Sequence, residues 1–577
     1  MKKRILTLGV VALGLLGGGC VSEDIDGLQK QIDELNGKIG DLEETQKQDL
    51  LNAMAAMEAK LAEMAANGDA DYTALMEQLR LMQEEVANNA SAIYYGNLTS
   101  DVEYAAFESQ GATIVTGRVL INDVNQLSKL AGVKMIGGEL SLMTAVNNME
   151  LDALQSVGGD LIVSGVEESS SLSLPSLTSV AGNLTVKDNT ELTAVNAAEL
   201  VFVDGGLSLE MNPKLEAFTL PKLDQVKEIN INEGVKVSNW QTDPGPLANL
   251  DLSYANVTDG VNIQYVAGGA LTLGQIGGGL VMENTGISKL EAKTTMLDGG
   301  LTLQYNSSLS EVMLDEVAKV YGDIVIKFNN ADSGIGGGIS GGMTSLPAFE
   351  KLTEIYGNVY VVANSKMNEL VGFNAVTKIE VPNDNSGDSG KIEITDNGSE
   401  IPVVNVFEAL ETAKKGYSTI DVIVRVKTNW LKSFSSLKNA RKVEVDLEIP
   451  TDGTGGIGIG SSAVNSANYT DAKFQGFDAL EYVHGIKLDL SDVTDFHDTA
   501  LGKLSSFRSY QNDTYYIYLS MPEEGVSLCA MSSLLNAIKD GDFDNNFNTS
   551  SREAIFTEGW THVDRDTAVA RLTAGCQ

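Results

Sequence analysis

A short glycine-anchored phrase recurs along this chain at nearly constant spacing. The segment VAGNLTV at Val180 returns as VDGGLSL at Val203, 23 residues later. Related phrases begin at Ile114, Ile136, Val157, Leu297, Val320 and Ile355. A period of roughly 20–50 residues indicates stacked structural units, because one such unit cannot bury its own apolar face. The repeat therefore constrains the fold more than any other feature.

Each repeat has the same internal order. An alternation such as Leu184-Thr185-Val186 predicts a strand whose outer two residues face the core. The polar turn after it contains Asn189 or Asn212, a residue type that tolerates unusual backbone angles and bonds neighbouring amides. A glycine is predicted to form the corner into the strand at Gly159, Gly182, Gly205, Gly322 and Gly357. We expect stacked repeats to build parallel sheets around one continuous core.

Later repeats are less regular. Strand character persists in residues 419–426, 442–449 and 485–490. Two glycine-rich stretches, 333–345 and 451–460, are predicted surface loops; no Lys-Ser/Thr pair follows the first, which argues against a phosphate-binding loop. A break near 330–350 would divide the array into two consecutive units. Residues 232–252 are too irregular to assign.

The first residues are typical of an exported lipoprotein. A basic start precedes an apolar run from Ile5 to Leu16, which is too short to span a bilayer. Residues 1–19 are thus a predicted signal peptide, and the sequence GGGC resembles a bacterial lipobox, which implies lipid on Cys20. The alternative is an ordinary secretory signal followed by an incidental cysteine. The acidic group after Cys20 resembles the surface-export signal of Bacteroidota lipoproteins and comprises Ser22, Glu23, Asp24 and Asp26.

Residues 20–92 are predicted to be an acidic tether and a coiled-coil stalk. Apolar residues alternate in steps of three and four at Ile25, Leu28, Ile32, Leu35, Ile39 and Leu42. Turn-forming residues around Gly68 leave two geometries open. We favour one long interrupted coiled coil that forms a homo-oligomer; a helix that folds back as a hairpin is the alternative.

Charge and cysteine usage narrow the function further. The formal net charge of −39 would repel phosphates, so nucleic acid is not an expected partner. Only Cys529 and Cys576 remain after Cys20, and an isolated pair in an exported protein predicts a disulfide. With only two cysteines besides Cys20 and three histidines in the whole chain, a zinc site is not expected.

Residues 505–577 are predicted to hold a last strand, Tyr515 to Leu519, and a helical C-terminal cap. The two helices would begin near Ser527 and Asp564. Between them, a run resembling the start of a calcium loop carries Asp540, Asp542 and Asp544. The run lacks the glycine and glutamate that such a loop requires, so we interpret it as a solvated turn and keep calcium binding as the alternative. No other cofactor is predicted.

Residues 93–504 are the predicted solenoid, and its repeat phrases resemble the receptor L-domain family from Ile93 to Leu490, most strongly from Tyr95 to Ile231. The segment YGNLTSDVEYAAFESQGATIVTGRVLI (Tyr95 to Ile121) looks like that family's opening strand, capping helix and first coil. The resemblance implies a right-handed parallel β-helix of leucine-rich-repeat type with a protein-binding, cell-surface role. It supplies no catalytic residues.

The expected protein is mainly β, a leucine-rich-repeat-like solenoid preceded by the coiled-coil stalk and closed by the helical cap. We expect it to be anchored by lipid on the outer membrane, exposed to the exterior, and to bind an extracellular protein or glycan for adhesion without catalysis. The alternative is a glycan-binding or glycan-cleaving β-helix of a polysaccharide-utilisation system. A structural coat or spacer protein is a third interpretation.

Overall fold

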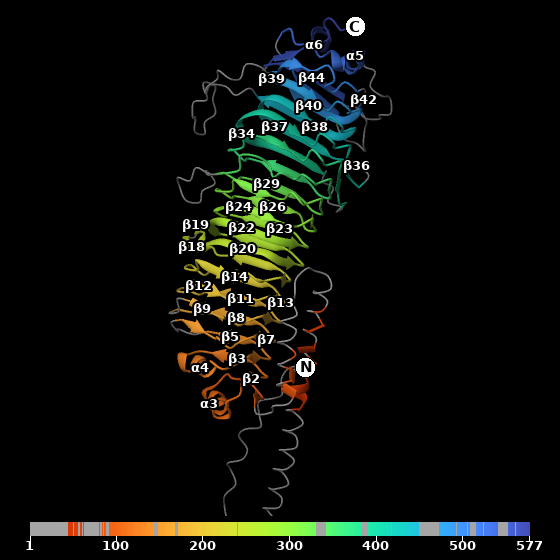
Figure 1. The fold of residues 1–577 in the computed structure, drawn as a ribbon. Coiled ribbons are helices and arrows are strands. Elements are labelled where there is room, and N and C mark those ends of the chain that lie inside the picture. Colours follow the sequence, from red (N-terminus) through yellow and green to blue (C-terminus); the bar gives the residue numbers. More distant parts are fainter. Residues whose placement is uncertain are drawn as a thin grey trace, which may run out of the picture.

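The structure is a computed structural model of a mainly β chain with many parallel strands. It describes residues 92–143, 148–167, 171–238, 241–330, 342–383, 390–416, 418–448, 472–491, 493–504, 506–507, 515–522, 524–540, 552–559 and 561–576, with scattered helical residues between 44 and 87. The strands rise one above another from the N-terminal to the C-terminal end of an elongated body, which we call the stack (Figure 1).

A first sheet contains 11 parallel strands, of which the early ones are only two residues long. Its strands are β1 (Ile93–Tyr94), β2 (Ile114–Val115), β4 (Met135–Ile136), β7 (Ser156–Val157), β10 (Ser179–Val180), β13 (Phe202–Val203), β16 (Gln225–Val226), β20 (Gly245–Val257), β22 (Val266–Ile276), β24 (Ile287–Ala292) and β27 (Glu311–Met313).

The second sheet runs along the whole stack. Its parallel ladder is β3 (Val119–Ile121), β5 (Leu140–Leu142), β8 (Leu161–Ser164), β11 (Leu184–Lys187), β14 (Leu207–Glu210), β17 (Ile229–Asn232), β21 (Val261–Gln264), β23 (Leu280–Glu283), β26 (Leu301–Gln304), β29 (Ile324–Lys327), β31 (Val359–Val362), β34 (Lys391–Val406), β37 (Asp421–Ser433), β38 (Asn439–Glu448), β40 (Tyr482–Asp489), β43 (Tyr515–Ser520) and β44 (Arg552–Glu558). Shorter strands join its long members: β32 (Leu370–Gly372), β39 (Ala472–Gly476), β41 (Val493–Phe496), β42 (Ser506–Phe507) and the antiparallel β45 (Thr561–Val563).

Two smaller sheets and one hairpin complete the strands. The third sheet is β6 (Met149–Glu150), β9 (Ser171–Ser173), β12 (Ala194–Asn196) and β15 (Ala217–Thr219). The fourth is β25 (Met296–Leu297), β28 (Lys319–Val320), β30 (Glu354–Ile355), β33 (Lys378–Val381), β35 (Thr412–Lys415) and the antiparallel β36 (Ser418–Thr419). The antiparallel hairpin is β18 (Val235–Ser238) and β19 (Gln241–Asp243).

The register of the second sheet follows the sequence period. Leu184 pairs with Leu207 and Val186 with Leu209, so equivalent residues of successive repeats stand side by side. These apolar residues are buried, while Thr185 between them is half-buried on the outer surface. Each fully buried aliphatic side chain contributes about 1.5–3 kcal/mol relative to exposure. The inward residues of all repeats form one core that runs the length of the stack.

The corner glycines are required by close approach between repeats. Of the five predicted, only Gly322 has a positive φ, at 142°. A Cβ on Gly182 would lie 2.7 Å from the carbonyl carbon of Gly159, and one on Gly357 only 2.1 Å from the carbonyl oxygen of Gly322. The glycines thus pack on one another from repeat to repeat, and a side chain would push the repeats apart.

The structure settles several boundaries. Strand β29 pairs with β31, Ile324 opposite Val359, so the second sheet continues across the predicted break near 330–350. Residues 232–252, unassigned from sequence, hold the β18–β19 hairpin and the start of β20.

The prediction that β43 is the last strand is wrong, because β44 and β45 extend the sheet beyond it. Most of the first glycine-rich loop and all of the second lie outside the described residues.

Stacked phenylalanines support the later repeats, whose glycine phrases are lost. Phe373, Phe407, Phe434 and Phe477 all have positive φ and are all buried. Their rings stack with centroid separations of 4.9, 5.5 and 5.1 Å. One aromatic residue per repeat at the same corner therefore maintains the register where the sequence pattern is weakest.

Helices lie at both ends of the stack. Near β3 are α3 (Asp101–Gln110), which has a capping box at Ser100, and α4 (Val124–Lys129). At the C-terminal end are η3 (Cys529–Met531), α5 (Ser532–Asp540) and α6 (Arg565–Leu572) (Figure 1). The predicted disulfide is present: Cys529 and Cys576 are bonded, with Cα atoms 5.3 Å apart. Closing this loop is worth about 4 kcal/mol in the chain-entropy account.

The helical residues between 44 and 87 differ from the extended stalk that we favoured. The Lys47 ammonium donates to the Ala87 carbonyl at 3.2 Å, and the Gln83 amide donates to Glu58 at 3.1 Å, as two antiparallel segments would. Met54 and Val86 are buried. The Thr116 hydroxyl, next to β2, donates to Gln46 at 3.1 Å. These contacts fit the hairpin alternative, in which the apolar seam is buried against the same chain.

Candidate functional site

A backbone turn at the end of the second-sheet strands sets apart one edge of the stack. After seven of the described strands the next residue has a positive φ between 53° and 58°: Asp188, Met211, Tyr265, Asn284, Tyr305, Phe328 and Ala363. Asp396, within the long strand β34, has a φ of 57° at the corresponding position. The turn breaks the in-out alternation, so this residue faces outward and the next one faces inward. We call the outward row, with the outer residues that end each strand, the turn edge.

The inward residue in most repeats is a fully buried asparagine. Asn189 donates through Nδ2 to Oδ1 of Asn212 at 2.8 Å and to the Val163 carbonyl at 3.1 Å. A second run of the same kind links Thr285, Asn306, Asn329, Asn364 and Asn397. Because each amide bonds both the next repeat and a backbone group, this ladder fixes the shape of the turn edge.

Glu233 ends the first run of the asparagine ladder. Glu233 is buried. Its carboxylate accepts two hydrogen bonds from Asn212, one from the backbone N–H at 2.7 Å and one from Nδ2 at 2.9 Å. Burial raises the pKa of Glu233 from 4.5 to about 7, although the two hydrogen bonds from Asn212 act in the opposite direction. A carboxyl group that titrates near neutrality therefore lies directly beneath the turn edge.

The titration of Glu233 should make stability depend on pH. The pKa of Glu233 is higher in the folded than in the unfolded chain. Glu233 therefore contributes most to the free energy of unfolding below about pH 4.5. The free energy of unfolding should then fall by about 3 kcal/mol as the pH rises to about 7. Urea unfolding across this range would measure the slope.

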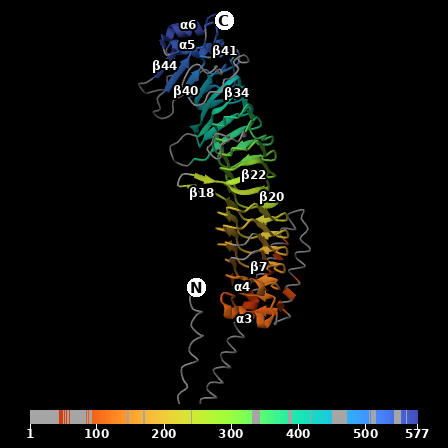
Figure 2. The same ribbon diagram turned by 90° about the vertical axis from the view of Figure 1, so that its left-hand side faces the viewer.

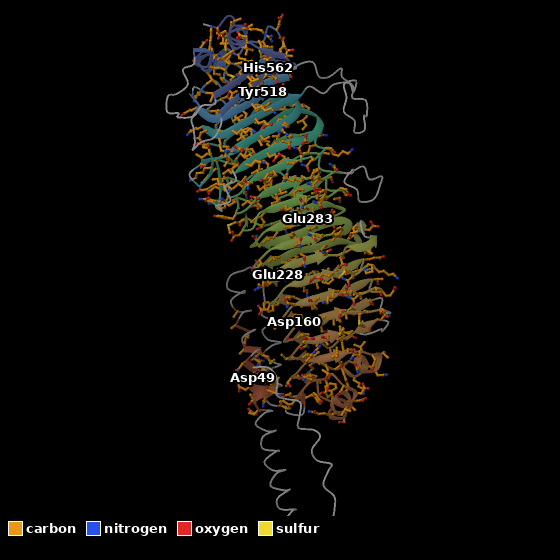
Figure 3. All side chains as sticks on the ribbon, turned by 180° about the vertical axis from the view of Figure 1, so that it is seen from behind. Asp49, Asp160, Glu228, Glu283, Tyr518 and His562 are labelled. Atoms are coloured by element: carbon orange, nitrogen blue, oxygen red, sulfur yellow. A yellow bond between two sulfur atoms is a disulfide. The ribbon has the colours of Figure 1, made fainter. Side chains whose placement is uncertain are left out.

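Two variants identify the group responsible. Glu233→Gln should remove this part of the slope, whatever its effect at a single pH. Glu228→Gln changes an exposed carboxylate at the opposite end of β17 and should keep the wild-type slope (Figure 3). An unchanged slope in Glu233→Gln would show that another group titrates.

A cavity of about 540 Å³ opens on the turn edge beside the hairpin. Asp188, Met211 and Tyr265 of the turn row line it, together with Glu210 and with Thr242 of β19. Figure 2 shows β18 projecting from the side of the stack, so the hairpin forms a wall of the cavity. No Lys, Arg or His is among the described residues that line the cavity.

The hairpin wall depends on a glycine. A Cβ on Gly234 would lie 2.8 Å from Cγ2 of Thr242 and 3.1 Å from the Tyr265 ring. Gly234 therefore lets the hairpin leave the stack close to the tyrosine, which fixes the width of the cavity at this point.

Aromatic and amide side chains continue along the turn edge beyond the cavity. The Tyr305 and Phe328 rings stack at 5.1 Å with planes 2° apart, and Phe328 is 37% exposed. Glu283, labelled in Figure 3, accepts hydrogen bonds from the side chains of Gln264, at 3.0 Å, and Gln304. The edge thus combines ring faces with neutral amides and carboxylates, and two lysines, Lys187 and Lys327, end strands β11 and β29.

A charged cluster on the outer surface of β37, β38 and β40 is self-contained. Glu444 is paired with Arg425, Lys442 and Lys487 at 2.6, 2.8 and 3.3 Å. Its desolvation would raise its pKa, but the hydrogen bonds from Lys442 and Arg425 lower the pKa to about 2. Because Glu444 is paired with three cations of the same chain, we assign this cluster a structural role and not a ligand-binding one.

Several predicted site residues lie outside the described part of the chain. These are Cys20, Ser22, Glu23, Asp24, Asp26, Asp542 and Asp544. Asp540 ends α5, and the calcium prediction stays untested. Within the residues that the structure describes, no group of three or more His, Cys, Asp or Glu side chains could hold a metal ion. His497 and His562 are exposed and lie away from the cavity lining.

The sequence analysis did not identify the turn edge. Its signal was the residue that precedes each buried asparagine, as in EMN (Glu210 to Asn212), QYN (Gln304 to Asn306) and KFN (Lys327 to Asn329). The variable middle position carries the outward side chain. The cavity itself had no sequence signal, because its wall comes from the region that could not be assigned.

Comparison with known proteins returns no matching family model, no matching curated protein and no matching solved structure. Among the residues that the structure describes, no helix has the length and apolar character needed to cross a membrane.

Proposed function

We propose that this chain is an exported lipoprotein that displays a β-solenoid on the cell surface to bind an extracellular ligand for adhesion or capture, without catalysis. In this proposal the stack is a right-handed, leucine-rich-repeat-like solenoid of the receptor L-domain kind. The helices α5 and α6 close its C-terminal end, and lipid on Cys20 anchors it to the outer membrane.

The cavity on the turn edge carries the binding part of the proposal. A volume of about 540 Å³ lies within the range of about 300–1,000 Å³ typical of ligand pockets. A hairpin that departs from the repeat forms one wall of it, whereas the neighbouring strands β21, β23 and β26 pair without a register shift. A departure from an otherwise regular array is where we expect a specific function.

The anchor and the proposed binding activity can be tested separately. Radiolabelled palmitate should attach to the full-length chain in a bacterial host and should not attach to Cys20→Ala. Whole cells that display the chain should bind ligands on glycan and extracellular-protein arrays saturably, and cells without it should not. Absence of saturable binding on both arrays would overturn the binding function, and persistent labelling of Cys20→Ala would overturn the anchor.

A glycan-binding or glycan-cleaving protein is the second candidate. The observation that favours it is the set of rings on the turn edge beside carboxylates: the half-buried Tyr265 and Tyr305 and the exposed Phe328. Cleavage would require an acid and a base or nucleophile placed across one glycosidic bond. Release of reducing ends from a bound polysaccharide would favour this candidate over simple binding.

A further inference from the structure

We propose that the turn edge, from Asp188 to Phe328, binds a neutral oligosaccharide, seated in the hairpin cavity and extended across the neighbouring strands. This inference rests on the proposed binding function and specifies its ligand class. Three properties of the edge support it: its charge, its aromatic faces and its hydrogen-bonding groups.

The charge of the cavity selects against anionic ligands. Among the residues that the structure describes, its lining includes the carboxylates of Asp188 and Glu210 and no cationic side chain. Phosphorylated, sulfated or uronic-acid ligands would bring like charges together without a counter-charge. A ligand with many hydroxyl groups instead can donate hydrogen bonds to carboxylates, which accept only.

The aromatic residues suit sugar rings. Tyr265 lines the cavity, and the stacked pair Tyr305 and Phe328 lies two and three strands farther along the second sheet. With adjacent strands about 4.8 Å apart, the faces from Tyr265 to Phe328 span about 14 Å. The apolar C–H face of a sugar can pack on such a ring while its hydroxyl groups reach the neighbouring polar side chains.

The hydrogen-bonding groups run parallel to the rings. Gln264, Glu283 and Gln304 occupy equivalent outer positions on β21, β23 and β26, one strand apart. The amides can both donate and accept, as hydroxyl groups require. A repeating ladder of side chains matches a ligand that is itself a chain of repeating units, which is why we assign an oligosaccharide rather than a single sugar.

Calorimetry with the full chain would test the assignment. The probes are neutral oligosaccharides of glucose, mannose and galactose, with sulfated and uronic-acid oligosaccharides for comparison. At least one neutral series should bind, with affinity that rises with chain length. Tyr265→Ala should weaken this binding about tenfold or more, as loss of an aromatic anchor does. Tyr321→Ala removes an exposed tyrosine next to the fourth sheet and should leave binding within about twofold.

A second variant separates loss of a ligand contact from loss of the fold. Asp188 is exposed, and asparagine tolerates its positive φ, so Asp188→Asn should fold normally and still weaken neutral-sugar binding. Binding of charged oligosaccharides alone, or neutral binding insensitive to both Tyr265→Ala and Asp188→Asn, would overturn the assignment. If an extracellular protein binds and the sugars do not, the ligand class is wrong while the proposed binding function stands. If nothing binds, both fail.

Discussion

Replacement of Asn329 by alanine is expected to lower the free energy of unfolding by about 4–6 kcal/mol. Asn329 is fully buried; its Oδ1 accepts from the backbone N–H and the Nδ2 of Asn306 at 3.1 and 3.0 Å. Its Nδ2 donates to the Leu303 carbonyl at 2.8 Å and to Asn364 at 3.1 Å. Alanine would remove these four hydrogen bonds, each contributing about 0.5–1.5 kcal/mol, and would deprive the buried Asn306 N–H of its acceptor at a cost of about 1–3 kcal/mol. Urea unfolding followed by circular dichroism would measure the loss.

The matched control is Asn196→Ala. Asn196 lies on β12 with an exposed side chain, so its loss should change stability by no more than about 0.5 kcal/mol. If Asn329→Ala were as stable as Asn196→Ala, the buried ladder would not be holding the repeats together, and the rigidity that we assign to the turn edge would have no support.

Gly357→Ala is expected to destabilise the stack by about 4 kcal/mol or more. The added Cβ would meet the carbonyl oxygen and carbon of Gly322 at 2.1 and 2.2 Å, and the Asp323 nitrogen at 2.6 Å. All three are backbone atoms, so no side-chain rotation can relieve the contact. The two repeats would have to separate, which would break hydrogen bonds such as Ile324 N–H to the Asn358 carbonyl at 2.9 Å.

Gly132→Ala provides the contrast in the same chain. A Cβ at Gly132 would meet no atom within 4 Å, and its φ lies outside the left-handed region. This variant should be neutral or slightly more stable, since alanine restricts the unfolded chain. Thermal unfolding of the two variants side by side would measure the difference, and equal melting temperatures would contradict the close approach between repeats.

Much of the parallel pairing could be predicted from sequence. The step from Val180 to Val203 is the step at which their strands pair, because a repeat whose apolar residues face inward must match its neighbour in register. The corner glycines were also predicted, but for their backbone conformation. In the structure only Gly322 of the five has a positive φ, and close contact between repeats explains the other four. A single sequence does not show how closely two backbones approach.

The candidate site was the least predictable part. The β18–β19 hairpin interrupts the period, and residues that interrupt a pattern cannot be assigned from that pattern. The spacing between Met211 and Tyr265 is also far from the usual period. Their proximity arises because β17 alone separates β14 from β21 in the sheet, and the intervening hairpin is placed outside the stack.

Residue type and spacing were enough to predict a repeating, mainly β chain with an inward apolar face, glycine corners and a C-terminal disulfide. These are local properties. Contacts in the folded chain were needed to show which outward residues gather into one surface, how far the sheet extends beyond β43, and that described helical residues before residue 92 contact one another. Each of these depends on contacts between segments distant in sequence, whose geometry is fixed when the repeats pack together.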